Sequence, residues 1–177
     1  MAAMTDIRFP IGRFEVRPEI DETERRSLIK SIAGAPVKLR AALEGLSPRQ
    51  LDEPYRPGGW TVRQVTHHLP DSHLNGYLRL KLALTEVHPT VKTYKEELWA
   101  ELEDARLAAP EISVRLLESL HERWTLVLRS LKPEHFTRTL THPEFGVMSL
   151  DALLQLYEWH GRHHIAHITS LRQRMAW

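Results

Sequence analysis

The sequence predicts an all-α protein: a four-helix bundle with an extended N-terminal arm and long connections between the helices. Two observations lead to this class. Four segments carry apolar residues at helical spacing, and the segments between them are rich in proline and glycine, with few strand signals. The 177 residues, 42% of them hydrophobic, fit a single domain over residues 1–177, without internal repeats or a second-domain boundary.

The arm and the first helix open the chain. Residues 1–20 contain prolines and a glycine among polar residues, which predicts an extended arm. Apolar residues then recur at helical spacing over residues 21–45, but Gly34 and Pro36 lie inside this stretch. The stretch is therefore either one kinked helix or two short ones. Residues 46–59 have loop composition, with room for one helical turn.

The second helix has a clear start. Thr61 can cap the backbone while Gln64, three residues later, reaches back, so the pair predicts a capping box. The helix is expected to run to about Glu86, with a local kink at Pro70 because proline removes one hydrogen bond. The following residues, 87–110, are irregular, with a short helix expected around positions 95–102.

Two further helices complete the predicted bundle. Residues 111–131 carry one stripe of apolar side chains, typical of an amphipathic helix. Residues 132–148 contain two prolines and a glycine and can form a short hairpin. The last helix is expected from Ser149, a good N-cap with Asp151 in the first turn, to about Ala176.

Composition excludes several function classes. The 24 Lys and Arg residues balance 23 Asp and Glu residues, so the sequence lacks the basic excess expected of a nucleic-acid binder. There is no cysteine, which rules out a disulfide framework, a thiolate metal cage and a cysteine nucleophile. No stretch approaches the ~20 apolar residues of a membrane span, and the N-terminus lacks a signal-peptide core. We expect a soluble, cytoplasmic protein.

Histidine is the unusual residue of this chain, with 11 copies, seven of them on the second and last predicted helices. On a helical wheel, one face of the last helix is apolar at both ends and histidine-rich in the middle. That face carries Leu153, Leu156, Tyr157, His160, His163, His164, His167, Ile168 and Leu171. His160 and His164 are one turn apart, so their rings can converge on one metal ion. A metal also supplies partners for buried ring nitrogens, which are costly when unpaired.

A third metal ligand must come from another helix. On the second helix, His68 lies nearer the apolar stripe than His67, which is expected to face solvent. His73 lies on the stripe and is expected to line the pocket or to hydrogen-bond a metal ligand. Asp71, three residues after His68, either orients a ligand imidazole or is exposed.

The remaining histidines have simpler interpretations. His163 and His167 are expected in the wall around the metal rather than on it. Four scattered residues are interpreted as surface or locally hydrogen-bonded histidines: His88, His121, His135 and His142. An alternative for the whole cluster is a dry bundle in which the histidines pair with one another.

Two segments resemble a known family. Residues 55–73 read YRPGGWTVRQVTHHLPDSH and residues 156–169 read LYEWHGRHHIAHIT. Both are similar to the YfiT-like metal-dependent hydrolases of the DinB superfamily, and the likeness runs from Phe9 to the C-terminus. The resemblance implies a four-helix bundle, usually a homodimer, with one divalent metal per chain, zinc or in some cases nickel. Its three ligands would be His68, His160 and His164. Pro70 departs from the family, where alanine is common.

Three functions are compatible with such a site. Three neutral imidazoles leave coordination positions open, and the metal lowers the pKa of a bound water toward about 7, as a hydrolase requires. It would also activate a thiol, and some relatives are thiol S-transferases that use bacillithiol, mycothiol or glutathione. In the third, non-catalytic alternative, His163 or Asp71 closes the fourth position. We expect a small-molecule substrate, and the candidates for proton transfer or substrate positioning are His73, Asn75, Arg79 and Trp159.

Overall fold

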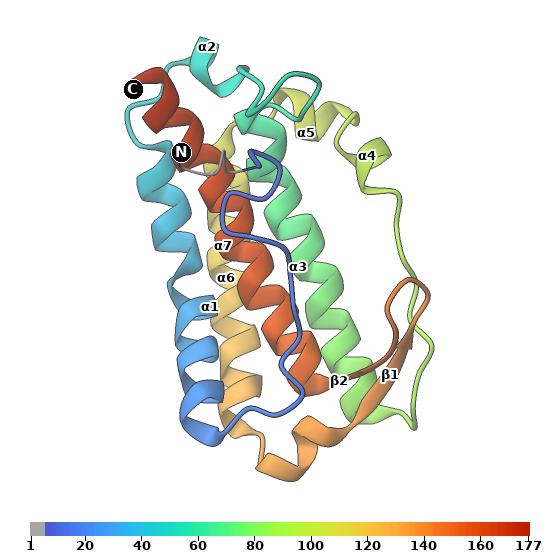
Figure 1. Ribbon diagram of the computed structural model, residues 1–177. Helices are drawn as coiled ribbons and strands as arrows, with labels where there is room; N and C mark the ends of the chain where they lie inside the picture. The colour runs from blue at the N-terminus through green and yellow to red at the C-terminus, as the bar shows by residue number, and fades with distance from the viewer. Residues whose placement is uncertain (1–5) are drawn as a thin grey trace.

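The computed structural model describes residues 6–177, which form a bundle of four long helices (Figure 1). These are α1 (Glu22–Leu43), α3 (Val62–Thr85), α6 (Pro110–Ser130) and α7 (Leu150–Met175). Helices α1 and α3 each pack against both α6 and α7. The predicted all-α class and its four helices are confirmed.

Short elements connect the long helices. They are α2 (Pro48–Leu51), α4 (Glu96–Trp99), α5 (Glu103–Leu107), the 3-10 helix η1 (Pro133–Thr137) and the antiparallel strands β1 (Thr139–His142) and β2 (Gly146–Ser149). The hairpin and the single turn before α3 agree with the prediction. The connection from α3 to α6 differs from it, because two short helices, α4 and α5, stand where one was expected.

The helix starts follow local sequence. Thr61 and Gln64 form the predicted capping box: the Thr61 hydroxyl accepts from the Gln64 N–H, and the Gln64 side chain accepts from the Thr61 N–H. At α7, the Ser149 hydroxyl accepts a hydrogen bond from the Ala152 N–H. These bonds satisfy N–H groups that have no partner within the helix, and they fix where α3 and α7 begin.

Both internal prolines lie inside continuous helices. Helix α1 contains Pro36 and is a single helix, which decides between the two predicted alternatives. Helix α3 continues through the buried Pro70 without a break in its secondary structure. Both helices pack against α6 and α7 along their length.

The core has an apolar cluster toward each end, with a layer of histidines between them. The cluster near the hairpin includes Leu80, Trp124, Leu128, Leu153 and Tyr157. The cluster near α2 includes Leu39, Val65, Leu69, Leu117 and Ile168. Between them along α3 and α7 lie His73, His160 and His164. His68 and His121 border this layer, at the edges of the two apolar clusters. This arrangement agrees with the stripe predicted for the last helix, which is apolar at its ends and polar in its middle.

The arm runs along α7 (Figure 1). Of the predicted arm, residues 6–20 contain no helix or strand, and residues 1–5 lie outside the described residues. The Arg17 N–H donates to Gln155 Oε1 at 3.0 Å, and the Phe9 ring lies 5.9 Å from the His163 ring. The arm therefore covers part of the histidine-bearing face of α7.

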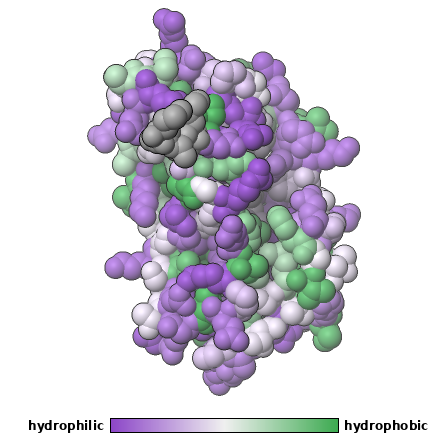
Figure 2. Space-filling model, viewed as in Figure 1, coloured by the Kyte–Doolittle hydropathy of each residue, from purple (hydrophilic) through white to green (hydrophobic). Residues whose placement is uncertain are grey.

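The described helices include none that is both long and apolar enough to cross a membrane. The face shown in Figure 2 is mostly hydrophilic, with hydrophobic residues gathered in small groups. That pattern is ordinary for a folded domain, whose surface always retains some apolar atoms.

Candidate metal centre

The structure brings His68 of α3 together with His160 and His164 of α7. One ring nitrogen of each histidine lies within 4.8 Å of the other two, an arrangement that could hold a metal ion. His68 and His164 are buried and His160 is half-buried. Helical spacing places His160 and His164 on one face of α7, and the packing of α3 against α7 places His68 opposite them.

The distances fit a shared ion. The Nε2 atoms of His68 and His160 are 3.2 Å apart. Two nitrogens bound to one tetrahedral zinc at about 2.05 Å are separated by about 3.3 Å. The same distance also suits a hydrogen bond between the two rings, as the dry-bundle alternative requires. The buried Nδ1 atom of His164 has no hydrogen-bond partner among the described residues, and the same is true of Nδ1 of His163 and of His167.

All three histidines are held in the neutral form that binds metals. Burial, reinforced by the neighbouring histidines His167 and His163, lowers the pKa of His68 to about 3. Burial first, and neighbouring histidines second, also lower the pKa values of His160 and His164 well below their ordinary value. Ligands must be deprotonated to bind, so the site is ready for a metal at neutral pH.

His73 hydrogen-bonds a member of this group, as expected. Its Nε2 lies 3.3 Å from His160 Nδ1, and its side chain is completely buried. On its other side, His73 Nδ1 lies 2.8 Å from Nε2 of His121. The interpretation of His121 as a surface or locally bonded residue is wrong, since it is 1% exposed and its partners come from α1 and α3.

The expectation that His67 faces solvent is also wrong. His67 is 5% exposed, its Nε2–H donates to the Ala108 carbonyl at 3.1 Å, and its Nδ1 lies 2.7 Å from Ser113 Oγ. The wheel assumed one buried face on the second helix. Helix α5 and the start of α6 cover a second face, so a polar residue there is buried with satisfied hydrogen bonds.

Three other residues that the sequence placed near the metal or the substrate are Asp71, Asn75 and Arg79. Asp71 is half-buried on α3, outside the three-histidine group, and burial with the nearby Asp104 raises its pKa to about 6. Asn75 donates to the Asp71 carbonyl within the same helix. Arg79 is buried and donates to the Tyr157 hydroxyl and the Lys92 carbonyl. The structure does not bring Asp71 or Asn75 to the three-histidine group.

His163, His167 and Trp159, all predicted around the metal ligands, line one cavity together with His160 and His164. The His163 ring stacks on Trp159 with centroids 4.3 Å apart, and the His167 ring stacks on Tyr55 at 4.0 Å. His167 Nε2–H also donates to the Arg8 carbonyl of the arm. These contacts hold both imidazoles beside the three-histidine group.

Two cavities open onto this group. One, of about 480 Å³, is lined by His160, His163, His164 and His167 together with Trp60, Arg8 and Arg56. The other, of about 300 Å³, lies toward the hairpin and is lined by Ser72, Arg79, Tyr94, Glu144 and Tyr157 among others. Trp159, His160 and Glu96 line both cavities. The larger cavity reaches His160 and His164 and the smaller one reaches His160, so a small molecule can approach His160 from two sides.

Glu96 was missed by the sequence reasoning. Its Oε2 lies 3.9 Å from His68 Nε2, and burial, with Glu97 and Glu144 nearby, raises its pKa above the ordinary range. The residue opens α4, a single turn in an irregular connection, so no periodicity marks it. Trp60 was also missed as a site residue: its ring lies 4.7 Å from the His68 ring, but the sequence marked it only as part of the family motif at residues 55–73.

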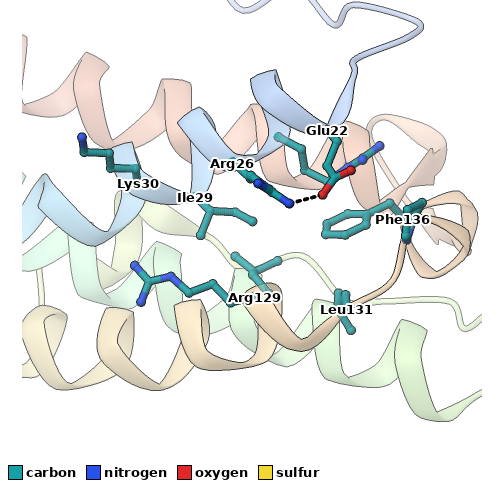
Figure 3. A pocket seen from close by; sticks show the side chains of 10 residues that line it. Glu22, Arg26, Ile29, Lys30, Arg129, Leu131 and Phe136 are labelled. Carbon is teal, nitrogen blue, oxygen red and sulfur yellow. Dashed lines mark hydrogen bonds and ion pairs between the residues drawn. The ribbon is translucent and has the colours of Figure 1, made fainter.

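A further cavity of about 430 Å³ lies between α1, α6 and η1 (Figure 3). Arg25, Arg26, Lys30 and Arg129 surround an apolar floor that includes Phe136, and Arg26 pairs with Glu22. No histidine lines it. This cavity is therefore separate from the three-histidine group.

The four-helix bundle agrees with the comparisons with known proteins. The profile of the DinB superfamily matches residues 32–168, and the chain belongs to this superfamily. Within it, the chain is YfiT-like. It is 53% identical over 174 residues to a Bacillus cereus protein named "Putative metal-dependent hydrolase", covering 98% of this chain and all of that protein. A Bacillus anthracis protein of the same name is 52% identical over the same coverage.

Solved structures give the same result. YfiT from Bacillus subtilis, described as "a probable metal-dependent hydrolase with an unusual four-helix bundle topology", is 46% identical. It superposes with a TM-score of 0.94, covering 97% of this chain and 98% of that one. TT2238, described as "a four-helix bundle protein", is 19% identical with a TM-score of 0.56, covering 82% of this chain and 98% of that one. The second likeness concerns the fold alone.

Proposed function

We propose that the protein is a metal-dependent hydrolase whose single divalent metal is held by His68, His160 and His164. The observation that carries the proposal is the convergence of three neutral ring nitrogens within 4.8 Å of one another at the meeting of two cavities. The names of the relatives support the same activity. Zinc is the favoured ion because a tetrahedral three-imidazole site with an open position suits it, and nickel is the alternative.

Bound to these histidines, a divalent metal would act as a Lewis acid and generate a nucleophile at neutral pH. The protein's own groups position the reactants. Trp60 and Trp159 contribute apolar walls to the larger cavity, and the arm lines part of it through Arg8. Apolar walls displace water and strengthen the electrostatic interactions inside the site.

Glu96 is the proton acceptor in this proposal. Its carboxylate lies on the cavity side of His68, 3.9 Å from Nε2, and lines both cavities. A carboxylate whose pKa is raised is a better base than an ordinary one and can later return the proton to the leaving group. Glu96 Oε2 takes the proton of the attacking group in this scheme.

The lack of a fourth protein ligand argues against a metal with a purely structural role. Among the described residues, the group that could hold an ion contains three histidines and no fourth protein ligand. A structural zinc site is normally closed by four protein ligands, whereas a catalytic one keeps a position for water or substrate. Asp71 and His163, the two residues considered for closing it, are not members of the group.

A thiol S-transferase is the second candidate, favoured by the presence of two cavities. They meet at Trp159, His160 and Glu96, so a thiol and an electrophilic partner could enter from opposite sides. The chain has no cysteine, so the thiol would arrive as a cosubstrate. A hydrolase needs one organic substrate and water, and one cavity would suffice.

One experiment separates the two activities. The zinc-loaded protein is incubated with a panel of esters and amides, and separately with low-molecular-weight thiols plus electrophiles. Turnover of the first panel that is lost in His164→Ala supports the hydrolase. Turnover of the second panel alone supports the transferase and contradicts the hydrolase. If neither panel reacts while zinc is bound, the result supports the third alternative, a metal site with a structural role and no catalysis.

A further inference from the structure

A continuous chain of three histidines leads from the metal site to the opposite side of the core. His160 Nδ1 lies 3.3 Å from His73 Nε2, and His73 Nδ1 lies 2.8 Å from His121 Nε2. The last ring nitrogen, His121 Nδ1, lies 2.7 Å from the Ile32 carbonyl of α1. We call His160, His73 and His121 the histidine chain. It runs from α7 through α3 to α6 and ends at the Ile32 carbonyl of α1.

The Ile32 carbonyl fixes the direction of every hydrogen bond in the histidine chain. A carbonyl oxygen can only accept, so His121 Nδ1 carries the hydrogen and donates it. A neutral imidazole has one N–H, so His121 Nε2 must accept, and His73 Nδ1 must donate to it. By the same reasoning His73 Nε2 accepts from His160 Nδ1–H, which leaves the Nε2 lone pair of His160 unprotonated.

The neutral state of the rings is supported by their burial. His73 and His121 are 0% and 1% exposed. Burial lowers the pKa of His121 to about 4. A second proton on either ring would also place two donors face to face at one of the contacts. Each ring therefore carries one hydrogen, and the carbonyl decides on which nitrogen.

We infer that His73 and His121 are positioning residues that hold His160 in the Nδ1–H tautomer, with its Nε2 lone pair presented to the metal site. The inference rests on the proposed metal site, since Nε2 of His160 is the atom that faces His68 Nε2 at 3.2 Å. A metal ligand needs its lone pair directed at the ion, and a fixed tautomer removes the wrong state before binding. Neither His73 nor His121 belongs to the three-histidine group.

The direct test reads the tautomers in the metal-free protein. Long-range ¹H–¹⁵N NMR correlations report which ring nitrogen carries the hydrogen, and we expect Nδ1–H for His121, His73 and His160. An Nε2–H tautomer at His73 or His160 overturns the inference. This readout needs neither metal nor turnover, so it stands even if the proposed function fails.

The second test uses zinc affinity, measured by competition with a chelator. His121→Phe removes the acceptor of His73 Nδ1–H, and we expect zinc to bind about 10–100-fold more weakly. In His121→Gln the side-chain oxygen can replace Nε2 as the acceptor, so most of the affinity should return. His67→Phe is the matched control, because it removes a buried histidine with two hydrogen bonds outside the histidine chain. Equal affinities in wild type, His121→Phe and His67→Phe would contradict the inference.

Discussion

The Nε2 atoms of His68 and His160 lie 3.2 Å apart although 92 positions separate the two residues in the sequence. Helix α3 supplies one ring and α7 the other, and His164 joins them from the next turn of α7. Because each ring is buried or half-buried and neutral, the pair forms the start of a binding site for a cation rather than a site that repels one.

Replacing Glu96 should separate chemistry from metal binding. In Glu96→Gln the proton acceptor is lost while the three histidines stay in place, so kcat should fall by roughly 10²–10⁴-fold. The bound metal, measured by elemental analysis, should be unchanged. Glu103→Gln, an exposed carboxylate at the start of α5, is the matched control. Full activity in Glu96→Gln would show that the proton goes elsewhere.

Gly76 should tolerate no side chain. A Cβ at this position of α3 would lie 2.4 Å from the Tyr157 ring and 2.7 Å from the Trp124 ring, both buried in the core. Overpacking of this kind costs about 1–3 kcal/mol, more than the gain of about 1 kcal/mol from helix propensity. Gly76→Ala should therefore lower the free energy of unfolding in urea.

Gly34→Ala is the matched control for that experiment. Gly34 lies inside α1, and nothing is within 4 Å of the Cβ that alanine would add. Only the propensity gain remains, so this variant should be stabilised by up to about 1 kcal/mol. If both variants change stability in the same direction, the close approach of α3 to α7 at Gly76 does not limit packing.

Acid should weaken the metal-free fold. Burial lowers the pKa values of His121 and His163 to about 4, whereas unfolded histidines titrate near 6.5. Between these values the unfolded state binds more protons, so the free energy of unfolding falls as pH drops. A shift of this size contributes roughly 3 kcal/mol at the fully buried His121 and less at His163, which is closer to solvent. Urea titrations at several pH values check the slope.

One variant shows how much of this pH dependence of stability comes from His163. His163→Phe keeps a ring against Trp159 but cannot take up a proton, so stability should fall less steeply between about pH 6.5 and pH 4. An unchanged slope would mean that His163 takes up its proton at the same pH in the folded protein as in the unfolded chain.

Asp71 should destabilise the protein at alkaline pH. Its pKa is raised to about 6 by burial and Asp104, so above that pH the folded state holds a carboxylate charge that the unfolded state accommodates more easily. Asp71→Asn should raise the free energy of unfolding by on the order of 1 kcal/mol at about pH 8, with no gain at about pH 3. Its metal content should equal that of the wild type. Loss of the metal would instead place Asp71 in the site.

The sequence predicted what depends on local spacing. Thr61 and Gln64 are three residues apart, so their capping box could be read directly, and His160 and His164 share a face because a helix repeats every 3.6 residues. His68 was selected by the same reasoning, applied to a second helix, and by the family resemblance. The homodimer and the cytoplasmic location stay predictions.

The rest depends on packing between distant segments. His67 was placed in solvent because a wheel cannot show that α5 covers a second face of α3. His121 shares the buried face of α6 with Leu117 and Trp124, so its burial could have been predicted from helical spacing. Its contact with His73 and the contact of Glu96 with His68 could not, because they join residues 48 and 28 positions apart. Such contacts follow from tertiary structure and leave no local pattern in the chain.

Metal stoichiometry tests the central claim most directly. The protein is loaded with zinc, dialysed against metal-free buffer and measured by elemental analysis, beside His68→Ala, His160→Ala and His164→Ala. We expect about one zinc per wild-type chain and nearly none in each variant, because two remaining imidazoles hold zinc poorly. The exposed His88→Ala should keep its zinc. The account would be contradicted if the wild-type protein retained no zinc, or if the three alanine variants each retained about one zinc per chain.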